Sequence, residues 1–168
     1  MERDELRALQ GPLKERYASA PEAAVVTLSA AGALGEGPSC SVRTGQALAT
    51  AGLHPATGGD GSLVCSGDML LEALVACAGV TLQAVATSLG IAVRSGKVRA
   101  EGDLDFRGTL GVDREAPVGF AAIRLAFELD TDADAEQLAT LRALTERYCV
   151  VYQTFASAPA LSTELTTA

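Results

Sequence analysis

The sequence predicts an α+β fold, in which antiparallel strands accompany a long buried central helix. Three observations support this class: an apolar helical segment at 68–89, two strand-like segments at 98–107 and 122–129, and a second helical segment at 131–149. Strands with one solvent-exposed face are typical of antiparallel sheets, so we expect these neighbouring strands to pair in an antiparallel arrangement. The order of strands, buried helix, strand pair, helix and strand is that of an α+β domain.

The composition is that of a globular chain with a negative charge. Its 168 residues include 13 Lys and Arg against 21 Asp and Glu, a net charge of −8, and 48% are hydrophobic. This length fits one domain. Nucleic acid and anionic membranes attract positive surfaces, so we expect neither as a partner. The N-terminal residues MERDELRALQGPLKERY carry charge throughout and lack the apolar run of a signal peptide, which favours a cytoplasmic protein.

The chain before the central helix divides into a helical extension and an irregular stretch that contains strands. Apolar residues recur at helical spacing within residues 1–20, which we expect to extend a single domain at 21–168. Gly11-Pro12 predicts a break between two short helices in this extension. Two strands are then predicted, around residues 25–30 and 40–49. Residues 54–62 are predicted to form an exposed loop.

The segment 68–89 is predicted to be a helix buried on most sides, because apolar or small residues surround most of its circumference. Ser66 is expected to cap it and Gly90 to end it. Its length would suit a membrane span, but Glu72 and Gln83 interrupt the apolar run and favour a core helix.

Two strands, a helix and a final strand are predicted after the central helix. Apolar residues alternate with polar ones in 98–107 and 122–129, the pattern of strands with one wet face. The next helix is expected to begin between Thr131 and Asp134, whose spacing fits a capping box. A last strand is predicted from the alternation of Leu161, Thr163 and Leu165.

Four cysteines, Cys40, Cys65, Cys77 and Cys149, are the residues with the most chemical interest. No two of them form a CxxC pair and the only histidine is His54, so we expect no metal site and no cofactor. A cytosolic setting disfavours structural disulfides. The cysteines are therefore either inert and buried or involved in thiol chemistry.

The positions of Cys77 and Cys149 set their expected roles. Cys77 lies three turns into the central helix, with Thr81 one turn further along the same face. A free cysteine there is either a small buried hydrophobe or a nucleophile. Cys149 ends the second helix, and a helix C-terminus does not lower the pKa of a thiol. Cys149 is therefore better suited to resolve an oxidised partner than to attack.

The segments LLEALVACAGVT and ERYCVVYQT, with a two-stranded segment between them, resemble the OsmC/Ohr family, the osmotically inducible protein C and organic hydroperoxide resistance group. The resemblance covers residues 24–167. It implies an intertwined homodimer, with antiparallel sheets wrapped around the central helices and active sites between the subunits. It also implies a peroxidase for organic or lipid hydroperoxides, in which Cys77 forms a sulfenic acid, Cys149 resolves it as a disulfide, and a dithiol such as a lipoyl protein resets the pair.

Peroxidase members of the family support the first cysteine with a Glu ahead of it and an Arg in an early strand. The matching Glu position is Gly67, beside Asp68, and the available arginine is Arg43. Asp68 and Arg43 are therefore the expected ionic support for Cys77. Two functions stay open: the peroxidase in oxidative-stress defence, and a non-catalytic OsmC-like protein that binds a small apolar or thiol-reactive ligand at the dimer interface.

Overall fold

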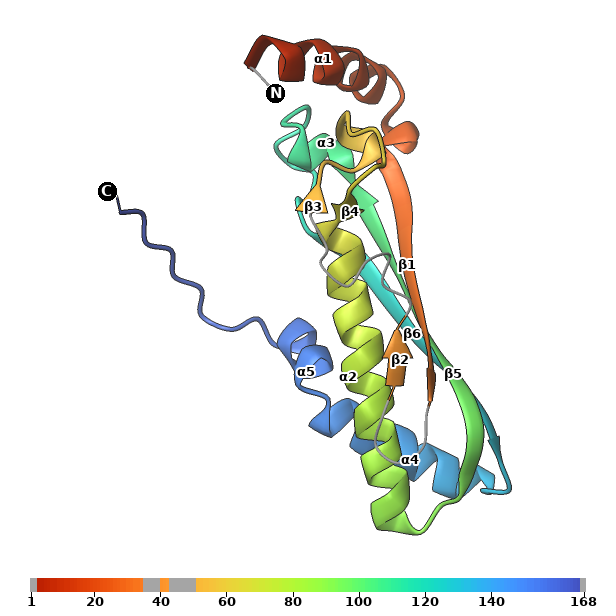
Figure 1. Cartoon of the computed structure of the whole chain (residues 1–168). Helices are drawn as coiled ribbons and strands as arrows, with labels where there is room; N and C mark the ends of the chain where they lie inside the picture. Colours follow the sequence, from red (N-terminus) through yellow and green to blue (C-terminus); the bar gives the residue numbers. More distant parts are fainter. Residues whose placement is uncertain (1–2, 35–39, 43–50, 167–168) are drawn as a thin grey trace.

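The computed structural model of the protein describes residues 3–34, 40–42 and 51–166. The helices are α1 (Arg3–Ser19), α2 (Ser66–Leu89), α3 (Phe106–Thr109), α4 (Ala135–Tyr148) and α5 (Val150–Ala156), with short 3-10 helices η1 (Pro21–Ala24) and η2 (Pro55–Thr57). The strands are β1 (Val25–Leu34), β2 (Cys40–Val42), β3 (Ala51–Gly52), β4 (Val64–Cys65), β5 (Val93–Asp105) and β6 (Phe120–Thr131). Helices that accompany an antiparallel sheet confirm the α+β prediction (Figure 1).

The main sheet has four antiparallel strands in the order β2-β1-β5-β6. β5 and β6 are the predicted strand pair, with Val98 opposite Phe127 and Ala100 opposite Leu125. β3 and β4 form a separate parallel pair. Of the strand predicted at 40–49, β2 covers the first three residues, and 43–50 lie outside the described part of the chain. Within the described residues, the main sheet ends on β6 at one edge.

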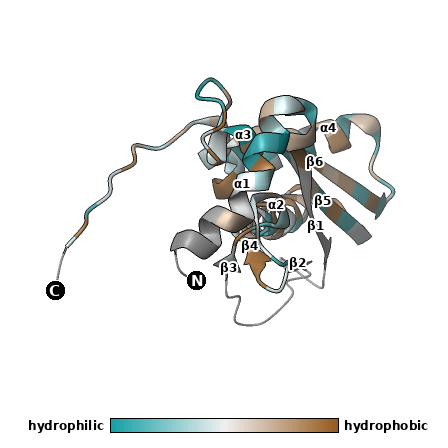
Figure 2. Ribbon diagram, turned by 90° about the horizontal axis from the view of Figure 1, so that it is seen from above, coloured by the Kyte–Doolittle hydropathy of each residue, from teal (hydrophilic) through white to brown (hydrophobic). Residues whose placement is uncertain are grey.

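The main core lies between α2 and the inner face of the sheet. On α2 the buried residues that form this core are spaced three and four apart, as in a helix with one apolar face, and are Leu71, Leu74, Val75 and Ala78. On β5, Val98 and Ala100 face them, because side chains on one side of a strand recur with period two. Figure 2 shows α2 seen along its axis beside β1 and β5. Burial of each large side chain here contributes about 1.5–3 kcal/mol.

The sheet, α4 and α5 pack against α2 and leave one strip of its surface exposed, so the prediction of burial on most sides is confirmed. By length and composition alone α2 could cross a membrane, because an 18-residue stretch of it has a mean hydropathy of 1.8. It forms the core of this fold, however, and 44% of that stretch is buried. The exposed apolar residues on one side of the helix form what we term the open face of α2: Met69, Leu70, Ala73, Val80 and Ala84. An apolar face of this length is typical of an interaction surface.

The two ends of α2 differ in how well the sequence predicted them. Ser66 is the first helical residue rather than the cap, and Cys65 holds the cap position without a side-chain hydrogen bond. Gly90 ends the helix as predicted, in the left-handed conformation with φ of 70°. Glycine adopts this conformation without the steric cost that a Cβ would add.

The N-terminal helix α1 is continuous, so the predicted break at Gly11-Pro12 is wrong. Pro12 has no backbone N–H, so the carbonyl of Ala8 lacks its helical hydrogen bond. Ala8 is exposed, and water can bind this carbonyl instead. The last turn of α1 is anchored by Tyr17, which is fully buried and donates a hydrogen bond of 2.7 Å to the carbonyl of Ala56. The helix thus packs on one end of the molecule (Figure 1).

The C-terminal part of the chain contains one helix more and one strand fewer than predicted. α4 begins after Asp134, which forms a capping box with Gln137. After α4 the chain forms α5, a helix that the sequence pattern did not indicate. Residues 158–166, where the last strand was predicted, are extended and pair with no described strand.

We expect Gly102→Ala to destabilise the fold by about 1–3 kcal/mol, the usual cost of overpacking a core. A Cβ at Gly102 would lie 2.5 Å from two ring carbons of Phe120 and 3.4 Å from Leu71 on α2. Gly119→Ala is the matched control, because nothing lies within 4 Å of its Cβ position. Urea unfolding measures both variants. Equal free energies of unfolding would contradict the close packing of the Phe120 ring on Gly102.

Candidate functional site

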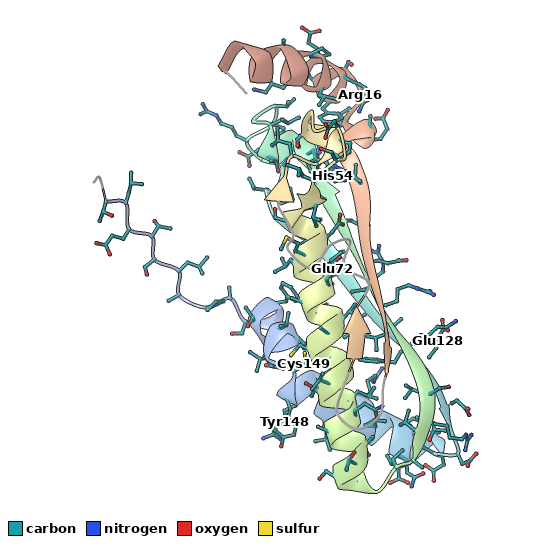
Figure 3. The ribbon with its side chains drawn as sticks, in the orientation of Figure 1. Arg16, His54, Glu72, Glu128, Tyr148 and Cys149 are labelled. Carbon is teal, nitrogen blue, oxygen red and sulfur yellow. The ribbon has the colours of Figure 1, made fainter. Side chains whose placement is uncertain are left out.

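The structure brings Cys77 and Cys149 together where α2 meets the start of α5. Cys77 is half-buried in the middle of α2, and Cys149 is fully buried against the core between α2 and the sheet. Their side chains are hydrogen-bonded to each other. Figure 3 shows Cys149 beside α2, next to the more peripheral Tyr148. The two residues chosen from the sequence therefore form one site.

Cys149 joins two helices rather than ending one. Its backbone N–H donates to the carbonyl of Thr145 at 2.9 Å and closes α4. Its sulfur accepts from the backbone N–H of Tyr152 at 3.4 Å and caps α5. The sequence analysis recognised the first of these roles and missed the second. The junction fixes the Cys149 side chain from both directions and turns the first N–H groups of α5 towards Cys77.

The pKa of the Cys77 thiol lies below its ordinary value, although its burial acts in the opposite direction. Burial raises the pKa because it removes water from the thiolate. Hydrogen bonds to the sulfur outweigh this effect, in decreasing order from the backbone N–H of Val151, the thiol of Cys149, the hydroxyl of Thr81 and the backbone N–H of Val150. All four are neutral donors. Cys77 is thus the more acidic thiol of the pair and the better nucleophile.

The pKa of Cys149 is raised to about 11, and its burial is the largest cause. The N–H of Tyr152 opposes this, while the hydrogen bond to Cys77 and the charge of its thiolate raise the pKa further. Cys149 is therefore a protonated thiol at neutral pH and donates its proton to the hydrogen bond with Cys77. The arrangement makes Cys77 the more acidic of the two thiols.

Asp68 does not lie beside Cys77. It precedes Cys77 by nine residues on α2, which is about 13 Å along the axis at about 1.5 Å per residue. The pKa of Asp68 lies above its ordinary value, because its burial outweighs the opposing effect of the nearby His54. Glu72, one turn further along, has a pKa raised by burial and by Asp68. Figure 3 shows Glu72 on α2 well away from Cys149. Arg43 lies outside the described residues.

Cys65 does not join the pair in the described structure. Cys65 precedes α2 and lies 12 residues before Cys77, about 18 Å along the helix axis and beyond disulfide reach. Cys40 is placed on β2 by its backbone only. Within residues 51–166 and the other described segments, no group of three or more His, Cys, Asp or Glu side chains is arranged to hold a metal ion.

The surroundings of the Cys77 sulfur on the exposed side are apolar. Ala73 and Val80 lie one turn before and one turn after Cys77 on the same side of α2, and both are exposed. Val150, whose N–H binds the sulfur, has 71% of its surface exposed. Cys77 thus sits at the edge of the open face of α2. A ligand that reaches it passes small apolar side chains.

A second apolar feature, which we term the β6 groove, lies on the other side of Cys149. It has a volume of about 330 Å³ and is lined by Leu74, Ile123, Leu125, Phe127, Tyr152, Phe155 and Ala156, with Arg142 and Glu146 as its charged residues. Three of these side chains form the inner face of the outer strand β6, and they are only half-buried. The groove therefore exposes part of the core.

The donors from Val150 and Val151 are the functional groups that sequence reasoning missed. They act through the backbone, so no side-chain motif identifies them. A signal for α5 does exist, because Val151, Tyr152 and Phe155 recur at helical spacing directly after Cys149 and no proline interrupts them. Thr81, by contrast, was placed correctly on the face of Cys77.

We expect Thr81→Val to raise the pKa of Cys77 and to slow its alkylation at pH 7 by about two- to tenfold, the worth of one hydrogen bond. The substitution keeps the side-chain volume and removes the hydroxyl donor. Thr81→Ser is the control, because it keeps the donor. The measurement is the rate of iodoacetamide labelling of Cys77 against pH, followed by peptide mass spectrometry. Identical profiles for the two variants would show that the hydroxyl does not support the thiolate.

Comparison with known proteins agrees with this fold. The sequence profile of the OsmC-like protein family matches residues 59–164. No curated protein matches the chain. An OsmC-like hydroperoxide resistance protein from Jannaschia sp. CCS1 superimposes with a TM-score of 0.63 and 16% identity, over 86% of this chain and 95% of that chain. An OsmC-like protein from Mycoplasma pneumoniae gives 0.56 and 16%, over 80% of this chain and 86% of that chain.

Proposed function

The chain belongs to the OsmC-like protein family, and we propose that it is a thiol-dependent peroxidase that reduces organic hydroperoxides. The observation that carries this proposal is the hydrogen-bonded pair of Cys77 and Cys149, in which one thiol is acidified and the other stays protonated. A peroxidatic cysteine must be a thiolate, and a resolving cysteine must be within reach of it. One of the structural neighbours is a hydroperoxide resistance protein, which fits the same chemistry.

In the first step the Cys77 thiolate attacks the outer oxygen of the hydroperoxide. The O–O bond breaks, and the alkoxide leaves and takes a proton from solvent to become the alcohol. Cys77 loses two electrons and becomes a sulfenic acid, the first rung of cysteine oxidation. The backbone N–H groups of Val150 and Val151 and the hydroxyl of Thr81 hold the sulfur for this attack.

In the second step Cys149 attacks the sulfenic sulfur of Cys77. The S–O bond breaks, the hydroxide leaves as water with the proton of Cys149, and a disulfide forms. An external dithiol then supplies two electrons and two protons through two thiol–disulfide exchanges, and both cysteines return to the reduced state. A lipoyl group is a dithiol of this class. A cytoplasmic location would provide such reductants.

The substrate class follows from the apolar approach to Cys77. Ala73, Val80 and Val150 surround the exposed side of the sulfur. These side chains favour the hydrocarbon part of an organic or lipid hydroperoxide over hydrogen peroxide, because burial of apolar surface contributes about 25 cal/mol per Å².

The same surface favours a homodimer as the active form. The open face of α2 extends from Met69 to Ala84 and exposes Met69, Leu70 and Val80. A second copy of the chain that covers this face would bury these residues and enclose the approach to Cys77. The active site would then lie between subunits, as the family resemblance implies.

A second candidate function is a non-catalytic protein that binds a small apolar or thiol-reactive ligand at the same place. The observation that favours it is the distance of about 13 Å along α2 between Asp68 and Cys77. The groups that lower the pKa of Cys77 are neutral donors. A thiolate held in this way would also capture an electrophilic ligand. Reaction with a hydroperoxide separates the two functions.

We expect one equivalent of cumene hydroperoxide to remove two thiols from the reduced native protein, because Cys77 and Cys149 form a disulfide. Cys149→Ser should stop at a Cys77 sulfenic acid that dimedone traps, and Cys77→Ser should keep all its thiols. Thiol titration with mass spectrometry of the tryptic peptides measures all three proteins. Cys65→Ser serves as the matched control and should react like the native protein.

The rate constants with cumene hydroperoxide and with hydrogen peroxide, measured side by side, test the substrate class. We expect the organic substrate to react at least about tenfold faster, which corresponds to about 1.4 kcal/mol of apolar contact. Unchanged thiols with both peroxides would exclude the peroxidase and leave the ligand-binding function.

A further inference from the structure

The helical path of the chain breaks at Cys149, between α4 and α5. Cys149 is extended, with φ of −73° and ψ of 109°, and α5 begins at the next residue. In an unbroken helix each backbone N–H bonds the carbonyl four residues earlier, so the N–H of Val150 would bond the carbonyl of Glu146. The N–H of Val151 would likewise bond that of Arg147. The break withdraws both N–H groups from α4.

Sulfur atoms accept the N–H groups that the break sets free. The first N–H groups of a helix have no partner inside it. At the start of α5, those of Val150 and Val151 bind the Cys77 sulfur. The N–H of Tyr152 binds the Cys149 sulfur at 3.4 Å. The contacts between α5 and the Cys77 sulfur therefore depend on the break.

The side chain of Gln153 bridges this break. Its carboxamide donates a hydrogen bond of 2.8 Å to the carbonyl of Glu146, in the last turn of α4. This carbonyl is the one that the N–H of Val150 would bond in an unbroken helix. The glutamine amide thus takes the place of the missing backbone donor, and the carbonyl keeps a hydrogen bond despite the break.

Gln153 lies on the side of α5 that faces away from the core. It is exposed, whereas the half-buried residues of α5 that pack against the core are Val151, Tyr152 and Phe155. Substitution of an exposed residue without special contacts usually changes stability little. An effect of Gln153 on Cys77 would therefore come through the bridge to α4 rather than through packing.

We propose that Gln153 is a positioning residue that holds α5 at its angle to α4 and thereby keeps the first N–H groups of α5 on the Cys77 sulfur. Without the glutamine amide, the open carbonyl of Glu146 draws the N–H of Val150 back towards α4. The thiolate then loses a hydrogen-bond donor. The catalytic meaning of this inference rests on the proposed function, because a less stable thiolate reacts less with a hydroperoxide at neutral pH.

The pH profile of Cys77 alkylation tests this role. Gln153→Met keeps the side-chain length and the helix propensity and removes the donor. We expect the midpoint of its iodoacetamide profile, read from the Cys77 peptide by mass spectrometry, to rise by about half to one pH unit. Labelling below the native midpoint then slows about three- to tenfold. Gln153→Asn keeps the amide but shortens its reach by one methylene, and we expect a change in the same direction.

Thr154→Val is the matched control. The Thr154 hydroxyl also donates a hydrogen bond of 2.8 Å and is also exposed, but its acceptor is the carbonyl of Val150 within α5. The variant therefore removes a hydrogen bond from the same helix without touching the bridge to α4. We expect its labelling rate to differ from the native rate by less than about twofold. Circular dichroism and urea unfolding check that every variant is folded.

Amide NMR of the reduced full-length protein reports the hydrogen bonds themselves. The N–H resonances of Val150 and Val151 should shift with pH at the midpoint of Cys77, because a thiolate is a stronger acceptor than a thiol. Cys77→Ser should abolish this shift. In Gln153→Met we expect the amplitude of the shift to fall at least about twofold, while Thr154→Val should keep the native amplitude.

The outcomes separate this inference from the proposed function. A Gln153→Met profile equal to the native one, or an equal rise in Gln153→Met and Thr154→Val, overturns the positioning role and leaves the peroxidase. A native profile for Gln153→Asn also overturns it, and this variant decides if Gln153→Met does not fold. A native Cys77 that is alkylated as a thiolate but does not react with cumene hydroperoxide overturns the peroxidase, while alkylation and NMR still decide the role of Gln153.

Discussion

The close packing of α2 on β5 determines where every functional group of this protein lies. Small residues contribute to it: Ala78 on α2 and Ala100 on β5 belong to the same buried cluster, and a Cβ at Gly102 would lie 3.4 Å from Leu71. With α2 fixed against the sheet, the turn that carries Cys77 has one position relative to the core. α4 and α5 then pack across the same helix, and Cys149 is buried in the core that α2 forms. The pairing of Cys77 with Cys149 is a consequence of how three helices and one strand fill space.

Neutral hydrogen-bond donors hold the Cys77 sulfur in the described structure. Its burial opposes the charged form, and backbone N–H groups together with the hydroxyl of Thr81 and the thiol of Cys149 outweigh that effect. Donors of this kind are positioned by the fold itself, since two of them belong to the backbone at the start of α5. A site built in this way depends on the geometry of the α4–α5 junction more than on any one charged side chain. It also keeps the approach to the sulfur apolar.

The sequence predicted the elements whose pattern is periodic and missed those whose origin is tertiary. The alternation in β5 and β6, the apolar α2 and its end at Gly90 were all predictable, as was Thr81 on the face of Cys77. The continuity of α1 through Pro12 was not predictable from the pattern, because it depends on access of water to the carbonyl of Ala8, which Pro12 leaves without a helical hydrogen bond. The two-sided role of Cys149 depends on α5, a helix of seven residues whose short run of apolar residues at helical spacing was not used to predict it. The groups around a sulfur are determined by packing between distant segments of the chain. Asp68 was chosen by its place in the sequence, but it lies nine residues from Cys77 along α2.

In the proposed peroxidase cycle, the unequal acidity of the two thiols would order the events in time. The thiolate of Cys77 helps to keep Cys149 protonated, through its charge and through the hydrogen bond that it accepts. Oxidation to the uncharged sulfenic acid removes that charge. Cys149 then ionises more readily at the moment when an attacking sulfur is required, and before that moment it is protected from oxidants. Reaction with the substrate would thus remove one of the causes that raise the pKa of the resolving thiol, while its burial, the largest cause, remains.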